Sequence, residues 1–186
     1  MVMNNLLELV LKSAYFIAPA ALANIAPVFS HKILKGKAVP VDLGKKFGRK
    51  PLFGSHKTYK GFFAGVITAI IVVFLQKEIY FVDGFKEFSL IDYSSINPFF
   101  LGFLFGFGAM FGDLAESFVK RRVGKKPGEA FVPWDQLDFI IGALVLTSFV
   151  YVPPWQVILA ALIITLIFHI LLSLAAYYLG LKKDKL

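Results

Sequence analysis

Cysteine is absent from the 186 residues, and histidine occurs only three times. Disulfides and thiolate metal sites are therefore excluded, and no cluster of histidines offers a zinc or iron site. Polar residues are also scarce: 58% of the chain is hydrophobic, whereas a soluble domain usually has about 45–50% apolar residues. The composition therefore excludes an ordinary soluble domain.

The apolar residues gather in blocks that are too long for the core of a globular protein. We therefore expect an all-α, polytopic membrane protein with five transmembrane helices, forming one catalytic domain over residues 1–186. The expected spans are about 6–29, 61–79, 98–119, 136–152 and 155–179.

Two of the spans contain residues that are unusual in a membrane helix. Pro19 and Pro27 free backbone carbonyls in the first span, which predicts a helix that is broken near a cavity. Asn24 lies between them and is either a functional contact or an interhelical hydrogen-bonding residue. The third span carries two GxxxG spacings, which predict close packing against neighbouring helices; the glycines are Gly102, Gly106, Gly108 and Gly112.

The basic residues are unevenly distributed along the chain. Of the 20 Lys and Arg residues, 17 lie in residues 31–60, 120–126 and 182–185, which fall on one side of a five-span protein. The positive-inside rule then places these loops and the C-terminus in the cytoplasm and the N-terminus outside the cell membrane. Because topology accounts for much of the net charge of +8, no nucleic-acid partner is expected. Contact with anionic lipid is an alternative role for the loops.

Acidic residues lie where a membrane helix rarely carries them. Asp113, Glu116, Ser117 and Lys120 are spaced at i, i+3, i+4 and i+7, so they share one helical face. Asp113 lies roughly 10 Å deeper in the membrane than Lys120, the first basic residue that follows it. An ionisable group at this depth indicates a functional site with a charged partner, and the alternative is a structural ion pair with another helix.

Two further carboxylates stand at the start of the fourth span, where Pro133 fixes the entry of the chain. One acid in a first helical turn is explained by the helix dipole. Asp135 and Asp138 together with Asp113 are more typical of the hard oxygen ligands that Mg²⁺ takes in addition to substrate phosphates. We therefore predict that these three aspartates bind Mg²⁺ and that the cytoplasmic loops form a polar active-site cavity.

A glycine turn just before the second span presents Lys57 and Thr58. Its spacing from Gly54 does not match the Walker A phosphate loop. A turn of this kind before a helix can still bind phosphate through backbone N–H groups. Alone, it is a weak indication.

Several pieces of the sequence, taken together, closely resemble the signature of the CTP-dependent lipid cytidylyltransferases, the phosphatidate cytidylyltransferase group. These pieces are Ser117-Phe-Val-Lys120-Arg121, Lys126-Pro-Gly128, Pro133 and Asp135-Gln-Leu-Asp138. Bacterial and eukaryotic members usually carry His-Gly-Gly before an Asp-Arg-x-Asp, and neither feature is present. This form of the signature is similar to that of the archaeal branch, the CDP-archaeol synthases. The same branch is indicated by the loop Pro40-x-Asp42-x-Gly44 … Gly54-x-x-Lys57-Thr58.

The resemblance implies that CTP and an isoprenoid glycerol phosphate lipid, with two ether-linked geranylgeranyl chains, give CDP-archaeol and pyrophosphate with Mg²⁺. Both the resemblance and the charge pattern favour Asp113, Lys120, Asp135 and Asp138 as catalytic residues. Lys57, Thr58 and Lys120 are expected at the triphosphate, and Arg121 or Arg122 at the lipid phosphate. The resemblance adds further substrate-binding residues: Asn24, Asp42, Gly54, Ser117 and Pro133.

Two other functions remain open at this point. A CTP-dependent lipid kinase would transfer the γ-phosphoryl group to an alcohol and release CDP. A small membrane transporter would use the intramembrane acid to carry an ion, but the five unequal spans have no evident inverted repeat.

Overall fold

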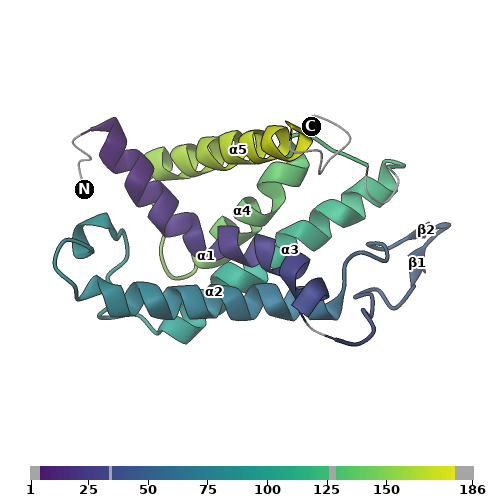
Figure 1. Ribbon diagram of the computed structural model, residues 1–186, viewed down its shortest axis with the longest axis horizontal. Helices are drawn as coiled ribbons and strands as arrows, with labels where there is room; N and C mark the ends of the chain where they lie inside the picture. Colours follow the sequence, from purple (N-terminus) through teal and green to yellow (C-terminus); the bar gives the residue numbers. More distant parts are fainter. Residues whose placement is uncertain (1–4, 34, 126–128, 179–186) are drawn as a thin grey trace.

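The computed structural model describes residues 5–33, 35–125 and 129–178, which form a helical bundle with one small hairpin (Figure 1). Lys126 and Gly128 of the motif and the basic residues 182–185 lie outside the described residues. The elements, in chain order, are α1 Leu6–Ile33, β1 Lys46–Phe47, β2 Lys50–Pro51, α2 Tyr59–Tyr80, the 3₁₀ helix η1 Lys86–Phe88, α3 Pro98–Arg122, α4 Trp134–Thr147 and α5 Trp155–Tyr178.

Within the described residues, four helices are long and apolar enough to cross a membrane, and they lie within α1, α2, α3 and α5. α4 has 14 residues and is about 21 Å long by the helical rise, which is shorter than a hydrocarbon core of about 30 Å. It ends at Thr147 instead of the expected residue 152, because the N–H groups of Val150 and Tyr151 turn back onto the Thr147 carbonyl. The all-α, multi-pass architecture is confirmed, with a fourth helix shorter than predicted.

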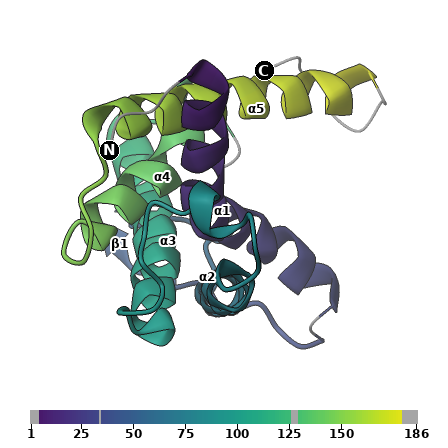
Figure 2. The same cartoon turned by 90° about the vertical axis from the view of Figure 1, so that its left-hand side faces the viewer.

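The first helix differs from the sequence-based expectation. α1 runs through Pro19 and Pro27 without interruption, so the prediction of a broken helix is wrong. Instead the helix changes direction about midway along its length (Figures 1 and 2). Proline removes a backbone hydrogen bond and crowds the preceding turn, which bends a helix when neighbouring helices support it. The predicted cavity is nevertheless present beside Pro27.

The loops segregate to the two ends of the bundle. The β-hairpin and the end of α3 lie at one end, whereas the start of α1 and residues 81–97 lie at the other (Figure 1). The two basic loops, residues 31–60 and 120–126, therefore share one end as far as the structure describes them. The arrangement agrees with the distribution of charge expected for a five-helix chain.

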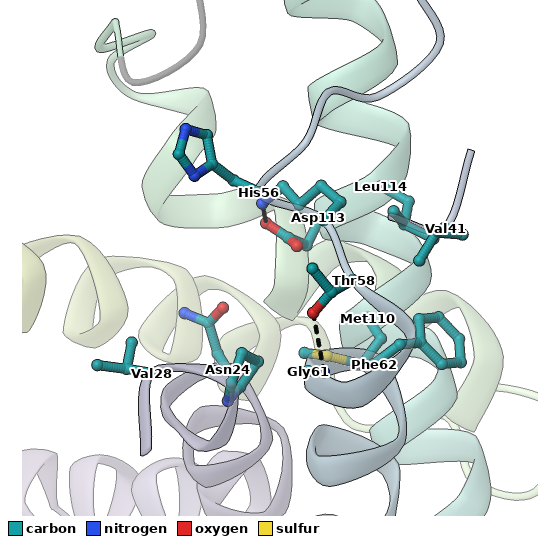
Figure 3. Close-up of a pocket in the computed structure, with 12 residues that line it drawn as sticks. Asn24, Val28, Val41, His56, Thr58, Gly61, Phe62, Met110, Asp113 and Leu114 are labelled. Atoms are coloured by element: carbon teal, nitrogen blue, oxygen red, sulfur yellow. Dashed lines mark hydrogen bonds and ion pairs between the residues drawn. The ribbon is translucent and has the colours of Figure 1, made fainter. Parts of the chain in front are cut away.

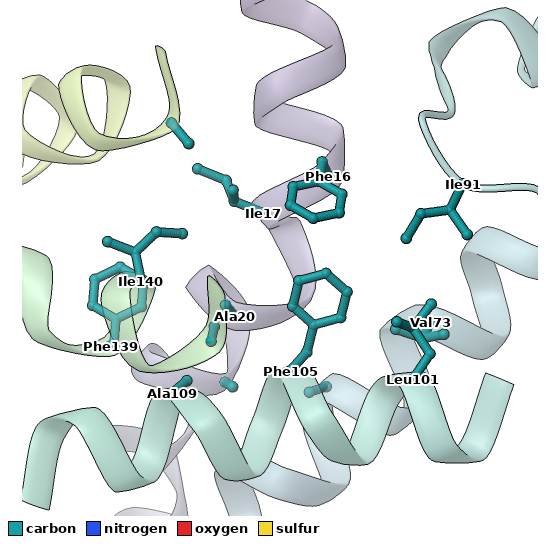
Figure 4. Packing of buried hydrophobic residues seen from close by; sticks show 14 of the residues in the cluster. Phe16, Ile17, Ala20, Val73, Ile91, Leu101, Phe105, Ala109, Phe139 and Ile140 are labelled. Carbon is teal, nitrogen blue, oxygen red and sulfur yellow. The ribbon is translucent and has the colours of Figure 1, made fainter. Parts of the chain in front are cut away.

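The hydrophobic core lies where α1, α3 and α4 cross (Figure 4). Phe16 and Phe105 pack edge to face with ring centroids 5.4 Å apart, and Ile140 is fully buried beside them. Edge-to-face aromatic pairs add about 0.5–1.5 kcal/mol to the free energy gained by burying their area. The core thus fixes α3 relative to its two neighbours.

The glycines of α3 face two different helices. A Cβ atom at Gly102 would lie 2.6 Å from the Cα of Ile70 in α2, and one at Gly108 would lie 2.8 Å from the Cα of Ala143 in α4. Gly112 is closer still, since a Cβ there would overlap the carbonyl oxygen of Asp138. The predicted dense packing is confirmed, and it brings the acidic part of α3 against the start of α4.

Candidate active site

A polar cleft of about 380 Å³ lies at the end of the bundle that carries the basic loops. Its walls come from the loop before α2, the last two turns of α3 and the first turns of α4. The residues lining it are Phe53, Gly54, His56, Lys57, Asp113, Glu116, Ser117, Lys120, Arg121, Asp135 and Asp138. All three predicted metal ligands therefore face one cleft.

Asp113 has the charged partner that its depth requires. Lys57 donates to Asp113 Oδ1 over 2.5 Å, and both side chains are about a quarter exposed, at 28% and 24%. Figure 3 shows Asp113 beside the loop that carries His56 and Thr58. Because this ion pair lies in the cleft, both groups remain available to a ligand. A structural pair sealed between two helices would not be.

A second ion-pair cluster joins α3 to α4. Lys120 donates to Asp135 Oδ1 over 2.8 Å and lies 3.6 Å from Glu116 Oε1. Asp135 Oδ2 accepts a hydrogen bond of 2.7 Å from the Phe131 N–H. Asp135 therefore fixes Lys120 and the segment before α4 at once.

Glu116 is a site residue for which the sequence pattern alone predicts no role. Its side chain is only 7% exposed, and within the described ranges no donor makes a hydrogen bond to its Oε1. Its position three residues after Asp113 was the available signal, since that spacing puts both on one face. A buried carboxylate oxygen without a hydrogen bond is costly, and Oε1 has only the Lys120 ammonium 3.6 Å away, so it can serve as a ligand atom at the wall of the cleft.

Asp138 reaches the cleft because of the contact at Gly112. The Asp138 main chain packs directly on Gly112, so the carboxylates of Asp113 and Asp138 line the same wall. Asp138 Oδ1 accepts a hydrogen bond of 2.6 Å from the Phe139 N–H. Asp138 therefore adds a fourth acidic side chain to the lining of the cleft.

The carboxylates fit Mg²⁺ in the presence of a phosphate substrate. Among the residues that can be described, no three acidic or histidine side chains enclose a metal ion by themselves. Mg²⁺ commonly binds one or two carboxylates together with substrate phosphates and water. The four acidic side chains of the cleft are hard oxygen donors of that kind, so the donor set fits Mg²⁺ held jointly by protein and nucleotide.

Asp42 lies behind the cleft and positions its loop. Its carboxylate accepts hydrogen bonds from the N–H groups of Gly44, Phe53 and Gly54, at 2.9, 3.1 and 3.0 Å. Desolvation alone would raise the pKa of Asp42, but the three N–H donors outweigh it and the pKa is lowered. Gly54 has a φ of +106°, a conformation that glycine adopts without strain. Asp42 thus acts on the site through the glycine turn.

We expect Asp42→Asn to loosen this loop. Losing charge-assisted hydrogen bonds should raise trypsin cleavage within residues 45–50 by about tenfold at neutral pH. The wild-type loop owes this stabilisation to the ionised carboxylate, so the stabilisation is present above the unfolded pKa of about 3.9 and is lost as the pH falls through the lower folded value. Hydrogen exchange of residues 43–58, measured as the pH is lowered, follows this loss of stabilisation. Asp83→Asn, at the opposite end, is the matched control, and equal cleavage of both variants would contradict the assigned role.

Thr58 lines a second cavity and is outside the set of residues that line the cleft. Its Oγ1 accepts from the Gly61 N–H over 3.2 Å and so caps α2. The second cavity, of about 190 Å³, is also lined by Asn24 and shares His56, Lys57 and Asp113 with the cleft (Figure 3). Asn24 therefore faces a cavity, as a functional contact would.

The two arginines that end α3 have different surroundings. Arg121 is 6% exposed, lines the cleft and donates to the Lys125 carbonyl over 2.7 Å. Arg122 donates to the carbonyls of Phe47 and Pro51, and its guanidinium lies 4.7 Å from the Phe118 ring centroid. Arg122 thus fastens the hairpin to α3, and of the two candidates for the lipid phosphate only Arg121 lines the cleft.

Of the remaining predicted residues, two line the cleft and one does not. Ser117 is 3% exposed and lines the cleft, as does Gly54. Pro133 precedes α4 at its N-cap position and is outside the set of lining residues.

Known proteins are similar to this chain in sequence and in fold. A model of the CarS-like family, CDP-archaeol synthase, matches residues 6–185. The chain belongs to the CDP-archaeol synthase family. Curated CDP-archaeol synthases from Archaeoglobus fulgidus and Methanococcus vannielii are 37% and 40% identical to it, each match covering 96% of this chain and 98% of the relative. The family resemblance expected from the motif is confirmed.

A solved structure agrees with the sequence relatives. It is described as an intramembrane enzyme for archaeal membrane lipids biosynthesis, and it matches with a TM-score of 0.67 at 27% identity, over 89% of this chain and 94% of the other. Family membership makes the present chain an enzyme of the nucleotidyltransferase class, acting in lipid biosynthesis within a membrane.

Proposed function

We propose that the chain transfers CMP from CTP to an archaeal lipid phosphate, an isoprenoid glycerol phosphate, and releases CDP-archaeol and pyrophosphate. The observation that carries the proposal is the polar cleft, where Lys57, Lys120 and Arg121 meet four carboxylates at one end of a membrane bundle. Such a site suits two polyanionic phosphates and a divalent cation.

The chemistry requires little of the protein beyond charge and position. A phosphate monoester has a second pKa of about 6, so the lipid phosphate is mostly a dianion at neutral pH. One of its oxygens forms a bond to the α-phosphorus of CTP. The bond from that phosphorus to the oxygen that bridges the α- and β-phosphates breaks, which releases pyrophosphate. No general base is needed. The barrier is repulsion between two anions, which closely placed cations lower.

The cations of the cleft are placed to exchange partners. Lys57 and Lys120 are held by Asp113 and Asp135. Phosphate oxygens of CTP would take the place of these carboxylates, so the lysines keep an anionic partner in both states. This exchange avoids an unpaired charge in a partly buried site, which would be strongly unfavourable.

The aspartates that line the cleft are the proposed Mg²⁺ ligands. Asp113, Asp135 and Asp138 would hold the ion together with phosphate oxygens of CTP, as expected from the sequence. Bound there, Mg²⁺ would neutralise negative charge on the triphosphate. Support comes from the position of all three side chains on one cleft wall or its rim.

The proposed orientation places the basic loops in the cytoplasm and the N-terminus outside. Its support is the shared end of the two loops (Figure 1) and the positive-inside rule. Because the chain has no cysteine, single cysteines at Lys45 and Asp83 can be labelled separately with an impermeant maleimide. Labelling of Asp83→Cys from outside intact cells, and of Lys45→Cys only after lysis, is expected; the opposite pattern would reverse the topology.

Product analysis tests the reaction itself. With CTP labelled at the α-phosphate, geranylgeranyl glycerol phosphate and Mg²⁺, the label should appear in the lipid and unlabelled pyrophosphate in solution. A lipid kinase would instead transfer a γ-label to a lipid alcohol and release CDP. Unlabelled lipid in both assays, with ion flux into liposomes independent of CTP, would favour a transporter.

A further inference from the structure

The bend of α1 leaves one backbone carbonyl without its helical partner. In an α-helix the N–H of each residue donates to the carbonyl four residues before it, and Pro19, about midway along α1, has no N–H. The carbonyl of Tyr15 therefore lacks its intrahelical donor. Inside a bilayer such a carbonyl is costly, and a neighbouring helix has to supply the missing hydrogen bond.

The donor comes from α2. Gln76 Nε2 donates to the Tyr15 carbonyl oxygen over 2.7 Å, and Gln76 is only 4% exposed. Its amide thus takes the place of the N–H that Pro19 does not have. The Tyr15 hydroxyl in turn makes a longer contact of 3.4 Å with the Gln76 main-chain carbonyl, so the two residues are joined twice.

A third residue determines which way the Gln76 amide points. The Tyr93 hydroxyl donates to Gln76 Oε1 over 2.8 Å, and Tyr93 is fully buried in the loop between α2 and α3. Because one end of an amide accepts and the other donates, a donor at Oε1 turns the NH₂ group towards Tyr15. Ile91 of the same loop belongs to the hydrophobic core (Figure 4), which holds Tyr93 in place.

The course of α1 beyond the bend determines the shape of a cavity next to the cleft. A Cβ atom at Gly61 in α2 would lie 3.1 Å from the Cβ of Pro27, so α1 and the start of α2 are in close contact there. Pro27 and Gly61 both line the cavity of about 190 Å³ that also contains Asn24 and Lys57 (Figure 3). A change in the bend would therefore move Asn24 relative to Lys57.

We propose that Gln76 is a positioning residue. Its amide replaces the missing N–H of Pro19, holds α1 in its bent course and so keeps Asn24 at the cavity. The last step rests on the proposed function, in which Lys57 binds phosphate oxygens of CTP. Gln76 itself is outside the residues that line the cavity and the cleft, so it acts on the site only through α1.

A double-mutant cycle between Gln76 and Pro19 tests the first step. Gln76→Leu leaves the Tyr15 carbonyl without a donor and should lower the unfolding temperature. In a Pro19→Ala chain, residue 19 has an N–H that can donate to this carbonyl. Gln76→Leu should then have a much smaller effect, and a Gln76→Leu chain that does not fold alone should be rescued by Pro19→Ala.

Thr147→Val is the matched control for the cycle. It also removes a fully buried hydrogen-bonding side chain, because the Thr147 hydroxyl donates to the Ala143 carbonyl over 2.8 Å within α4. Its effect should be the same in the wild-type and Pro19→Ala chains. If Gln76→Leu likewise has equal effects in the two chains, or is not rescued, Gln76 is an ordinary buried contact between two helices and the proposal is overturned.

Spin labels measure the bend directly and do not depend on activity. Because the chain has no cysteine, Leu7→Cys and Phe29→Cys place one label on each side of the bend, at exposed positions of α1. The distance distribution between the labels, measured by pulsed EPR, should shift or broaden in Gln76→Leu and stay as in the wild type in Thr147→Val. An unchanged distribution in Gln76→Leu would overturn the proposal.

Kinetics test the step from the bend to the site. Gln76→Leu should lower kcat/KM for CTP by about 2- to 30-fold, the range in which substitutions remote from a ligand act. The KM for the lipid phosphate should stay unchanged. Asn24→Ala should also lower kcat/KM for CTP, and adding Gln76→Leu to it should have little further effect, since Gln76 acts through Asn24. Fully additive losses would overturn this step.

The two proposals fail separately. A wild-type chain that makes no CDP-lipid would overturn the proposed function and with it the role of Asn24 in binding CTP. The unfolding and spin-label results decide the role of Gln76 in the bend, whatever the activity. A wild-type chain that makes CDP-lipid, combined with an unchanged bend in Gln76→Leu, would retain the reaction and exclude Gln76 as a positioning residue.

Discussion

Asp138→Asn is expected to lower CDP-lipid formation by about 10²–10³-fold or more, the range found when a group that stabilises developing charge is removed. Asp138 lines the polar cleft, in which the two substrate phosphates are proposed to meet. An amide keeps the size of the side chain and can still accept from the Phe139 N–H. It removes the charge, and with it the affinity of the site for Mg²⁺.

The measurement is initial rate with α-labelled CTP, combined with thermal unfolding to establish that the variant is folded. A second readout is the rise in unfolding temperature on adding Mg²⁺ and CTP, which the variant should lose because binding stabilises only the folded state. Asp83→Asn, at the opposite end of the bundle, is the control. A variant at position 138 that turns over at near wild-type rates would exclude Asp138 as a metal ligand.

Asp135→Asn should have an effect as large for an additional reason. Asp135 accepts from Lys120 and from the Phe131 N–H, so its replacement also releases a buried lysine. We therefore expect lower thermal stability for Asp135→Asn than for Asp138→Asn, although both are nearly inactive. Equal stability would show that the Lys120 ion pair contributes little to the fold.

Gly112→Ala should be one of the most damaging glycine-to-alanine substitutions among the residues that the structure describes. Its Cβ would overlap the Asp138 carbonyl oxygen, and a backbone atom cannot move away by rotating a side chain. Overpacking of this kind typically costs about 1–3 kcal/mol of stability, sometimes more. The helices must also separate, which displaces Asp113 from Asp138, and a shift of about 1 Å can cost about 10²-fold in rate.

Gly65→Ala is the matched control for this substitution. A Cβ at Gly65 would crowd the side chain of Met110 in α3 and would lie 3.0 Å from the Ala23 carbonyl oxygen in α1, so this variant also loses stability but leaves the contact between α3 and α4 unchanged. Turnover per folded protein should therefore fall strongly for Gly112→Ala and much less for Gly65→Ala. If the two variants behave alike, the close approach of α3 and α4 is not what places the carboxylates.

Much of the site follows from helical spacing and can be predicted. The face shared by Asp113, Glu116 and Lys120 is fixed by their positions, and the GxxxG spacings predict where other helices approach. The choice between Arg121 and Arg122 cannot be made in that way. Adjacent residues point about 100° apart on a helix, and the rotation of α3 that turns Arg121 inward is set by packing on two other helices.

Loop geometry and helix ends were the least predictable features. The pairing of Lys57 with Asp113 joins residues that are 56 positions apart, through a loop whose path depends on the three N–H groups bound to Asp42. The early end of α4 depends on how residues 148–152 return to Thr147. Neither follows from periodicity, because each is decided by tertiary contacts.

One helix, α3, contributes Leu114 to the cavity beside Pro27 and Ser117 to the cleft. Inserting one residue within α3 would rotate everything beyond it by about 100° and advance it by about 1.5 Å. The proposed nucleotide contacts and the proposed metal ligands would then lose their alignment together. Insertions of similar size in residues 81–97, at the far end of the bundle, should leave the alignment intact. Changes of length in this enzyme are therefore expected to be tolerated in loops and not in α3.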